Sequence, residues 1–270
     1  MNFGGIYPAC SLKDAQFVVI PVPYDLTSTY QPGSRRGPAA IIEASTNMEL
    51  YDEELKKETY LAGIHTTLPV TVDARGPKNM VNAVRKKISR VIALDKIPVM
   101  LGGEHSISLG AVQAVCERYP KLTILQLDAH ADLRDSYQGT PYNHACVARR
   151  ITEICPLVQV GIRSMSKEEG DYLPQSKVKS YSADYVLANG KWAQPSVKIC
   201  GGMSLLPSIW MYSIHRSCPQ PARLSPEALP GMMFCNCCAW FRKSAIFAVL
   251  TLSSWRRCRE WLPRISWLPN

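Results

Sequence analysis

Tryptophan is absent from the first 190 residues of this chain, and aspartate is absent after Asp184. All six tryptophans and six of the ten cysteines lie after residue 190. A single folded domain rarely changes its composition this sharply along the chain. The break divides the sequence into residues 1–190 and a tail, residues 191–270, of different character.

Features of membrane and secreted proteins are also missing. The apolar run Ala245–Leu252 is far shorter than the ~20 residues that cross a bilayer. Met1–Ser11 is polar and contains glycine, whereas a leader has basic residues followed by an apolar stretch. We therefore expect a cytoplasmic protein that has no membrane partner.

The positive charge is confined largely to the tail. Ten Lys and Arg face two Glu there, a net charge of +8, which leaves +1 of the chain's +9 for residues 1–190. A nearly neutral segment offers no basic face to nucleic acid. A nucleic-acid-binding module thus has only the tail charge to support it, and we expect no nucleic-acid partner.

The cysteines of the first 190 residues suggest no disulfide framework and no zinc site. Their positions show no paired spacing: Cys10, Cys116, Cys146 and Cys155. In a cytoplasmic chain such cysteines are expected to be reduced thiols. We assign them no chemistry.

Apolar, β-branched runs alternate with helical stripes along residues 1–190. Strands are predicted at Phe17–Val22, Ile97–Leu101, Leu122–Leu127 and Leu157–Gly161. Helices are predicted at Pro38–Leu50, Pro77–Lys96 and, with a capped start, Ser106–Tyr119. The alternation predicts an α/β three-layer sandwich with a doubly wound parallel sheet, whose functional loops gather outside the carboxyl ends of the strands.

Potential metal ligands follow two of these strands. The segment Asp128-Ala129-His130-Ala131-Asp132 places a ligand at every second position, so an extended backbone would aim all three to one side. His105 occupies the equivalent loop after another strand. A solvated acidic turn is the alternative, but the second histidine favours a metal site.

Two motifs of this sequence resemble the signatures of a known family. Gly102-Gly103-Glu104-His105-Ser106 and Leu127–Asp132 resemble the two amino-proximal signatures of the arginase/agmatinase ureohydrolases. The similarity covers roughly residues 3–190 and is greatest to prokaryotic agmatinases. It implies an arginase-like fold, of which residues 1–190 supply the amino-terminal two-thirds, and homo-oligomers are common in the family.

The resemblance also implies a metal centre. His105, Asp128 and Asp132 would bind one Mn²⁺, His130 would bind a second, and Asp128 would bridge both. Mixed carboxylate and imidazole ligands suit Mn²⁺, whereas zinc sites favour Cys and His. Two such ions make hydroxide available near neutral pH. The implied reaction is hydrolysis of a guanidino group with release of urea.

The loop after the metal motif bears on the substrate. Thr140–Val147 resembles the agmatinase version of this loop, which implies agmatine as substrate and putrescine as product, in polyamine biosynthesis. His144 matches the family histidine that passes a proton to the leaving amine, and imidazole suits that role. Asn143 stands where serine is common and is the expected substrate contact. Arginine and guanidinobutyrate remain alternative substrates.

The family pattern stops before the metal site is complete. A later Asp-x-Asp pair and a guanidinium-binding glutamate are both absent, since no aspartate follows Asp184. The second ion would keep only His130 and the bridging Asp128. We expect at most one Mn²⁺ per chain here, against two per subunit in the family.

The genetic code suggests why the pair is absent. Read from the third base of each codon, Trp210-Met211 must encode Asp and Met211-Tyr212 must encode Val. The neighbouring codons permit the family signature Asp-(Met/Leu)-Asp-Val-(Leu/Phe)-Asp-Pro. We infer a frameshift between about residues 190 and 203, which makes residues 191–270 an out-of-frame tail without its own domain.

Two expectations follow from this interpretation. Residues 203–270 should have no packed structure of their own, because their apolar residues keep no period for long. A catalytically inactive product of a damaged agmatinase gene is then the alternative to an active agmatinase.

Overall fold

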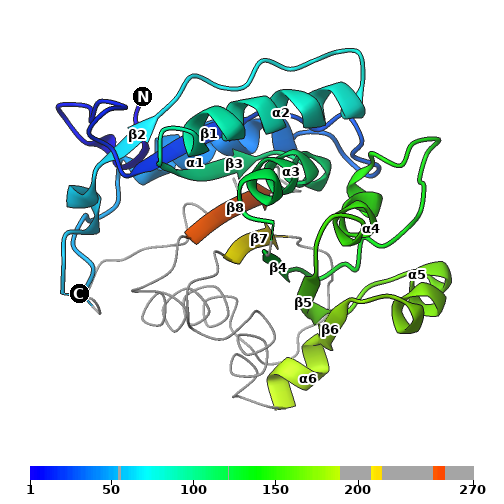
Figure 1. The fold of residues 1–270 in the computed structure, drawn as a ribbon. Coiled ribbons are helices and arrows are strands. Elements are labelled where there is room, and N and C mark those ends of the chain that lie inside the picture. The colour runs from blue at the N-terminus through cyan, green and yellow to red at the C-terminus, as the bar shows by residue number, and fades with distance from the viewer. Residues whose placement is uncertain (54–55, 121, 189–207, 215–245, 253–270) are drawn as a thin grey trace.

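The computed structural model describes residues 1–53, 56–120, 122–188, 208–214 and 246–252. Its strands form one eight-stranded sheet in the order β2-β1-β3-β8-β7-β4-β5-β6, and every pairing in it is parallel. Helices pack on the sheet (Figure 1). The predicted doubly wound parallel sheet is confirmed. In the part of the chain that the structure describes, no helix is long and apolar enough to cross a membrane.

The elements follow one another in a βα pattern. The strands are β1 Phe17–Val22, β2 Ile64–Thr66, β3 Ile97–Gly102, β4 Thr123–Leu127, β5 Leu157–Ile162, β6 Lys179–Ser182, β7 Ser208–Ile214 and β8 Ile246–Leu252. The helices are α1 Gly37–Ser45, α2 Pro77–Ile92, α3 Ser108–Arg118, α4 Val147–Thr152, α5 Lys167–Tyr172 and α6 Ala183–Ala188. Among the short 3₁₀ turns, η4 His105–Ile107 and η5 His144–Cys146 carry candidate site residues.

Alternate residues of β1 point to opposite faces of the sheet, and both faces are buried. Val18 and Ile20 belong to the large core that α2 and α3 cover. Val19 belongs to a separate cluster with Ile42 of α1. α6 closes this second face farther along the sheet, where Val186 packs on β4 and β5. Burial on both sides explains the continuous apolar run.

Two helix boundaries differ from the prediction, and near each of them a serine hydroxyl donates a hydrogen bond within the chain. α3 begins at Ser108 and has no side-chain cap, although a capped start was expected at Ser106. The Ser106 hydroxyl instead donates to Glu104 Oε1 at 2.6 Å. α1 ends at Ser45 rather than Leu50, and the Ser45 hydroxyl donates to the carbonyl of Ile42 at 2.7 Å.

Two strands lie in the segment for which no packed structure was expected. β7 pairs with β4, β8 pairs with β3, and the two pair with each other in the centre of the sheet. The expectation is therefore wrong for residues 208–214 and 246–252, because their backbones complete the ladder between β3 and β4. Residues 203–207, 215–245 and 253–270, and the proposed boundary at 190, lie outside the described residues.

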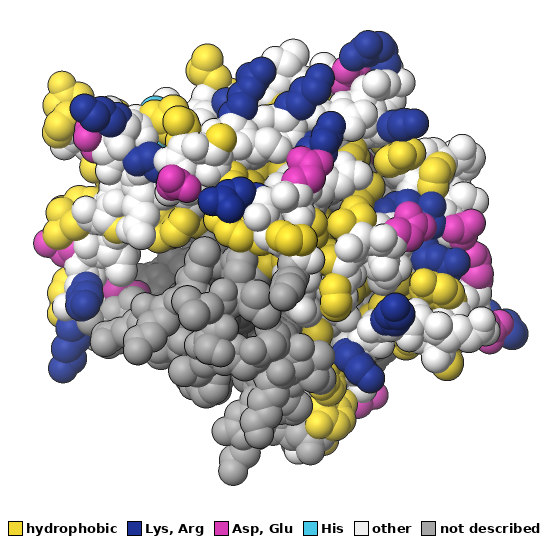
Figure 2. Space-filling model, in the orientation of Figure 1, with side chains coloured by type: hydrophobic (Ala, Val, Ile, Leu, Met, Phe, Trp, Pro, Cys, Tyr) yellow, Lys and Arg dark blue, Asp and Glu magenta, His cyan; other side chains and the backbone are white. Residues whose placement is uncertain are grey.

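The described surface carries charges of both signs. Figure 2 shows Lys and Arg side chains with Asp and Glu side chains between several of them on the face drawn. Arg85 of α2 donates to Glu117 of α3 at 2.6 Å, one such pairing between neighbouring helices. This mixture agrees with the small net charge of residues 1–190.

Candidate metal centre

The candidate site lies where three loops leave the carboxyl ends of strands. The loop after β1 carries Thr27, the loop after β3 carries Glu104 and His105, and the loop after β4 carries Asp128. Two strands separate β3 from β4, a span of ~14 Å at the usual strand spacing. The loops therefore meet over the ends of β8 and β7.

A glycine lets the first two loops come together. A Cβ atom at Gly103 would lie 1.9 Å from the carbonyl oxygen of Tyr24, so no other residue fits there without a backbone shift. The amide of Glu104 donates to that same carbonyl at 2.8 Å. Asp25 holds the remainder of the β1 loop by accepting from the amides of Gly33, at 2.6 Å, and Arg35, at 3.3 Å.

The first group of ligands is closed and buried. Ligand atoms of His105, Asp128 and Asp132 all lie within 4.8 Å of one another. His105 Nδ1 is 2.7 Å from Asp132 Oδ2 and 3.3 Å from Asp128 Oδ2. All three residues are at most 6% exposed. The structure thus brings together three of the four predicted ligands as one set.

The fourth predicted ligand, His130, faces the other oxygen of Asp128. His130 Nδ1 lies 3.7 Å from Asp128 Oδ1, and the His130 amide donates to the same oxygen at 3.0 Å. Its side chain is 27% exposed, while that of Asp128 is 0% exposed. Asp128 therefore turns one oxygen toward each histidine, an arrangement that would allow it to bridge two ions.

Backbone pairing and two glutamines hold the metal motif in place. The carbonyl of Ala129 accepts from the amides of Arg163, at 2.9 Å, and Ser164, at 3.0 Å, which extends the β4–β5 pairing past the strand ends. Gln126 Nε2 donates to Asp128 Oδ2 at 3.1 Å, and Gln159 donates in turn to Gln126 Oε1 at 2.9 Å. The two glutamines thus fix the orientation of the Asp128 carboxylate.

The motif is extended only as far as Ala131. Asp132 has a φ of +51°, the left-handed region that Asp tolerates better than most residues. The predicted alternation therefore does not describe the whole motif. The turn at Asp132 directs its carboxylate toward His105, and the amide of Leu133 beyond it donates to the buried Glu169 at 2.8 Å.

The electrostatics of this group favour a bound cation. Burial raises the pKa of Asp132, since two carboxylates share a site that excludes water. Burial lowers the pKa of His105 and its contacts with Asp132 and Asp128 raise it, with a net increase. His105 Nε2 is also buried without a hydrogen-bond partner among the described residues. Two buried carboxylates and an imidazole, without thiols, fit a divalent ion such as Mn²⁺.

His144 and Asn143 begin the short turn η5 beside this group. His144 Nδ1 lies 3.3 Å from Thr27 Oγ1 and 3.7 Å from Glu104 Oε2. Burial lowers the pKa of His144, which keeps the imidazole neutral and able to accept a proton at neutral pH. Asn143 Oδ1 caps the turn by accepting from the Ala145 amide at 3.0 Å. Its Nδ2 is buried without a partner in the described part of the chain.

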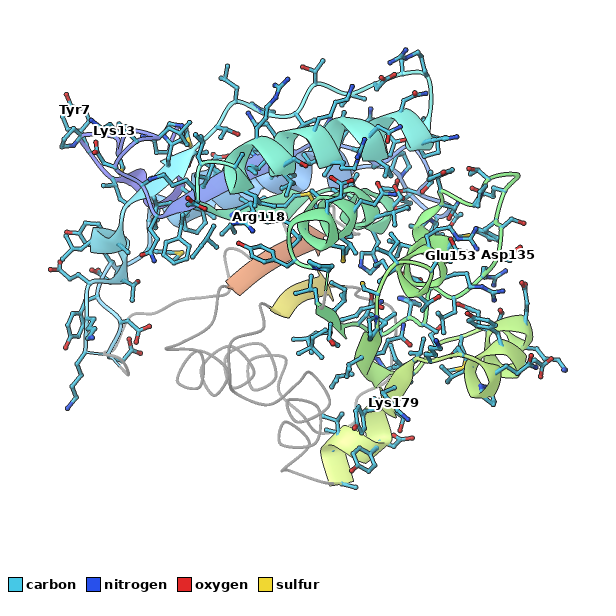
Figure 3. The ribbon with its side chains drawn as sticks, in the orientation of Figure 1. Tyr7, Lys13, Arg118, Asp135, Glu153 and Lys179 are labelled. Atoms are coloured by element: carbon cyan, nitrogen blue, oxygen red, sulfur yellow. The ribbon has the colours of Figure 1, made fainter. Side chains whose placement is uncertain are left out.

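A charged side chain ties the loop before η5 to α4. Arg150 Nη2 lies 2.6 Å from Asp135 Oδ1 and 3.0 Å from Glu153 Oε1. Figure 3 shows Asp135 and Glu153 side by side near α4. Both carboxylates are more than half exposed, so these pairs add little stability but fix the direction of the loop.

Several residues of the site were not predicted from the sequence. The structure adds these buried polar side chains: Thr27, Glu104, Ser106, Gln126 and Gln159. Gln126 and Gln159 interrupt apolar strands, which was a usable signal, because a buried amide needs partners. Thr27 gave no such signal, since its partners lie 77 and 117 residues away.

A carboxylate and imidazole cluster at the carboxyl edge of a doubly wound sheet places this chain among metal-site α/β proteins. The arginase family model matches residues 15–197, more than half of the sequence. The chain belongs to the arginase family.

Relatives and solved structures agree with this assignment. The chain is 35% identical over 194 residues to N(1)-aminopropylagmatine ureohydrolase of Synechocystis sp., a match that covers 69% of this chain and 63% of that protein. It is 34% identical over 181 residues to agmatinase of Bacillus cereus, covering 64% and 61%. The crystal structure of agmatine ureohydrolase of Thermoplasma volcanium matches with a TM-score of 0.79 and 28% identity, over 93% of this chain and 86% of that one.

The sequence matches extend over only part of these relatives. They span about three-fifths of the relatives' own length, 63% and 61% in the two cases. The family model establishes the family, while the activity of a whole family member is a proposal for this chain.

Proposed function

We propose that this chain is a manganese-dependent ureohydrolase that hydrolyses agmatine to putrescine and urea. The observation that carries the proposal is the closed group of His105, Asp128 and Asp132, with the second oxygen of Asp128 directed at His130. Similarity to proteins named agmatinase and N(1)-aminopropylagmatine ureohydrolase supports a guanidino substrate.

Each residue has a role in this proposal. His105, Asp128 and Asp132 would hold one Mn²⁺, and His130 with Asp128 would supply two ligands of the family's second site. Bound divalent ions supply Lewis-acid activation of water for attack on the guanidinium carbon. His144 accepts a proton and returns it to the amine as the C–N bond breaks, so that water and agmatine yield urea and putrescine.

Metal content is part of the same proposal. The second site lacks the Asp-x-Asp pair, and in the described residues the group that could hold an ion is His105, Asp128 and Asp132. We therefore expect at most one Mn²⁺ per chain and slow turnover. The end of the family match at residue 197 lies within the interval proposed for the frameshift, which supports that interpretation.

Urea and putrescine release from agmatine tests this function. The purified chain should form both products with Mn²⁺ present and should stop when a chelator removes the metal. Asp132→Asn should abolish the activity. Asp95→Asn is the matched control, because Asp95 is exposed and has nearly the same backbone angle, φ +53° against +51°. Equal rates in the two variants, or turnover without metal, would contradict the proposal.

N(1)-aminopropylagmatine is a second candidate substrate. The relative from Synechocystis sp., at 35% identity, bears that name. Comparing kcat/KM for agmatine, N(1)-aminopropylagmatine, arginine and guanidinobutyrate decides between them. A preference of at least about tenfold, ~1.4 kcal/mol, for any of the last three would replace agmatine in the proposal.

Location and assembly belong to the same proposal. Free thiols at all four described cysteines agree with a reducing, cytoplasmic compartment. A homo-oligomer without nucleic-acid or membrane partners is proposed from the resemblance and from the near-neutral first 190 residues. Light scattering of the purified chain measures its oligomeric state.

A further inference from the structure

The hydroxyl of Thr27 lies between Glu104, in the loop after β3, and His144, the candidate proton carrier. It donates a hydrogen bond to Glu104 Oε2, accepts from the backbone amide of His144 at 3.1 Å, and faces His144 Nδ1 at 3.3 Å. Thr27 is 6% exposed and Glu104 is 2% exposed, so water does not compete for these contacts. Three loops thus meet at one oxygen atom.

Counting donors and acceptors fixes the direction of each bond. A hydroxyl has one proton to donate and two lone pairs that accept. The amide of His144 can only donate, so it occupies one lone pair. The ionised carboxylate of Glu104 can only accept, and it also accepts from Ser106 Oγ at 2.6 Å, so the Thr27 proton is committed to it.

One lone pair of Thr27 is left for the imidazole. His144 Nδ1 can use it only as a donor, which requires the proton of the neutral ring to be on Nδ1. The negative charge of Glu104, 3.7 Å from Nδ1, favours the same tautomer. His144 Nε2 is then the basic nitrogen of the ring.

We propose that Thr27, backed by Glu104, is a positioning residue that holds His144 as the Nδ1–H tautomer and so leaves Nε2 free to accept and return the proton. Thr27 grips both the backbone and the ring of His144, which fixes the orientation of the ring as well as its tautomer. The catalytic part of this inference rests on the proposed ureohydrolase function, whereas the tautomer itself does not.

Nitrogen-15 NMR of the full chain tests the tautomer. The chain is labelled at histidine and studied at pH 8.5, where carboxylates are ionised. The His144 signals are assigned by their loss in His144→Gln. We expect a protonated Nδ1 and a bare Nε2 in the natural chain and in Thr27→Ser, and a loss of this preference in Thr27→Val, which keeps the shape but not the hydroxyl.

Two results would overturn the inference. A proton on Nε2 in the natural chain contradicts it even if Thr27→Val does not fold, and so does an unchanged tautomer in a folded Thr27→Val. Turnover adds a second readout: kcat should fall at least about tenfold in Thr27→Val with KM unchanged, and Thr27→Ser should restore it. Absence of any urea release with the expected tautomer would refute the function and leave the positioning role intact.

Discussion

The two sides of Asp128 differ in burial and in their distance to a histidine. On one side, Oδ2 lies 3.3 Å from His105 Nδ1, which is itself 2.7 Å from Asp132, and all three side chains are at most 7% exposed. On the other side, Oδ1 lies 3.7 Å from His130 Nδ1, whose side chain is 27% exposed. One carboxylate thus faces a buried histidine on its closed side and a partly exposed histidine on the other, here called the open side.

One of the strands that lie beside Asp128 in the sheet is β7. β7 pairs with β4 so that Leu127 lies opposite Tyr212, which brings the end of β7 beside Asp128. The codons of residues 208–214 are those whose alternative frame permits the family's Asp-x-Asp signature. Under the frameshift hypothesis, backbone pairing would keep β7 in the sheet while its side chains no longer include the family's Asp-x-Asp pair.

Restoring the reading frame should have the largest effect. A gene in which codons 208–214 encode Asp-(Met/Leu)-Asp-Val-(Leu/Phe)-Asp should bind a second Mn²⁺. Its urea release from agmatine should exceed that of the present chain about a thousandfold, because a second Lewis acid contributes several kcal/mol and each ~1.4 kcal/mol is tenfold. Equal rates would contradict both the frameshift and the ligand count.

The bridging role of Asp128 predicts the next effect. Asp128→Asn should weaken binding of the first Mn²⁺ at least about a hundredfold, since it removes a ligand from the closed side. His130→Asn should change that dissociation constant by less than about threefold, because His130 belongs to the open side. Isothermal titration of both variants measures the contrast, and similar losses in the two would show that the sides are not distinct.

The closed side also depends on a backbone approach that only glycine permits. Gly103→Ala should lower the free energy of unfolding by about 2 kcal/mol, because its Cβ would lie 1.9 Å from the Tyr24 carbonyl. Gly170→Ala in α5 is the matched control, since its Cβ would meet its nearest neighbour at 3.7 Å. Denaturant titration measures the free energy of unfolding of both variants. An equally small change in both would contradict the need for glycine at position 103.

Glu104 predicts a smaller, pH-dependent effect in the metal-free protein. Burial raises its pKa from 4.5 to about 7, so between these values the folded state holds a proton that the unfolded state releases. The contribution of Glu104 to stability is then greatest below pH 4.5 and falls as pH rises, by at most ~1.4 kcal/mol per pH unit. Glu104→Gln should have a smaller slope than the natural chain, while the exposed Glu117→Gln should keep the natural slope. The same slope in the natural chain and Glu104→Gln would contradict the burial argument.

The sequence predicted the strands whose own residues are apolar enough to be buried. β1 has the predicted bounds Phe17–Val22, because a short β-branched run closed by Pro23 suits a strand buried on both faces. The edge strands β2 and β6 were missed, since each has at most four residues and none of them is buried. Their strand form depends on pairing with β1 and β5.

The candidate site was predictable in its ligands and not in its supports. His105 and Asp128 follow strands, and parallel strands place their exits at one edge, so their meeting could be expected. The left-handed turn at Asp132 and the grip of Thr27 on His144 arise only when distant loops meet. A capped helix at Ser106 was expected because the buried carboxylate that competes for its hydroxyl was not recognised.

The amount of Mn²⁺ bound per chain shows whether the closed group of His105, Asp128 and Asp132 is the metal site. The full chain, its Asp132→Asn variant and its Asp95→Asn control are dialysed against Mn²⁺, and bound metal per chain is measured by atomic emission. We expect no more than one Mn²⁺ in the natural chain, the same amount in Asp95→Asn, and almost none in Asp132→Asn. Two ions in the natural chain, or equal occupancy in the two variants, would contradict it.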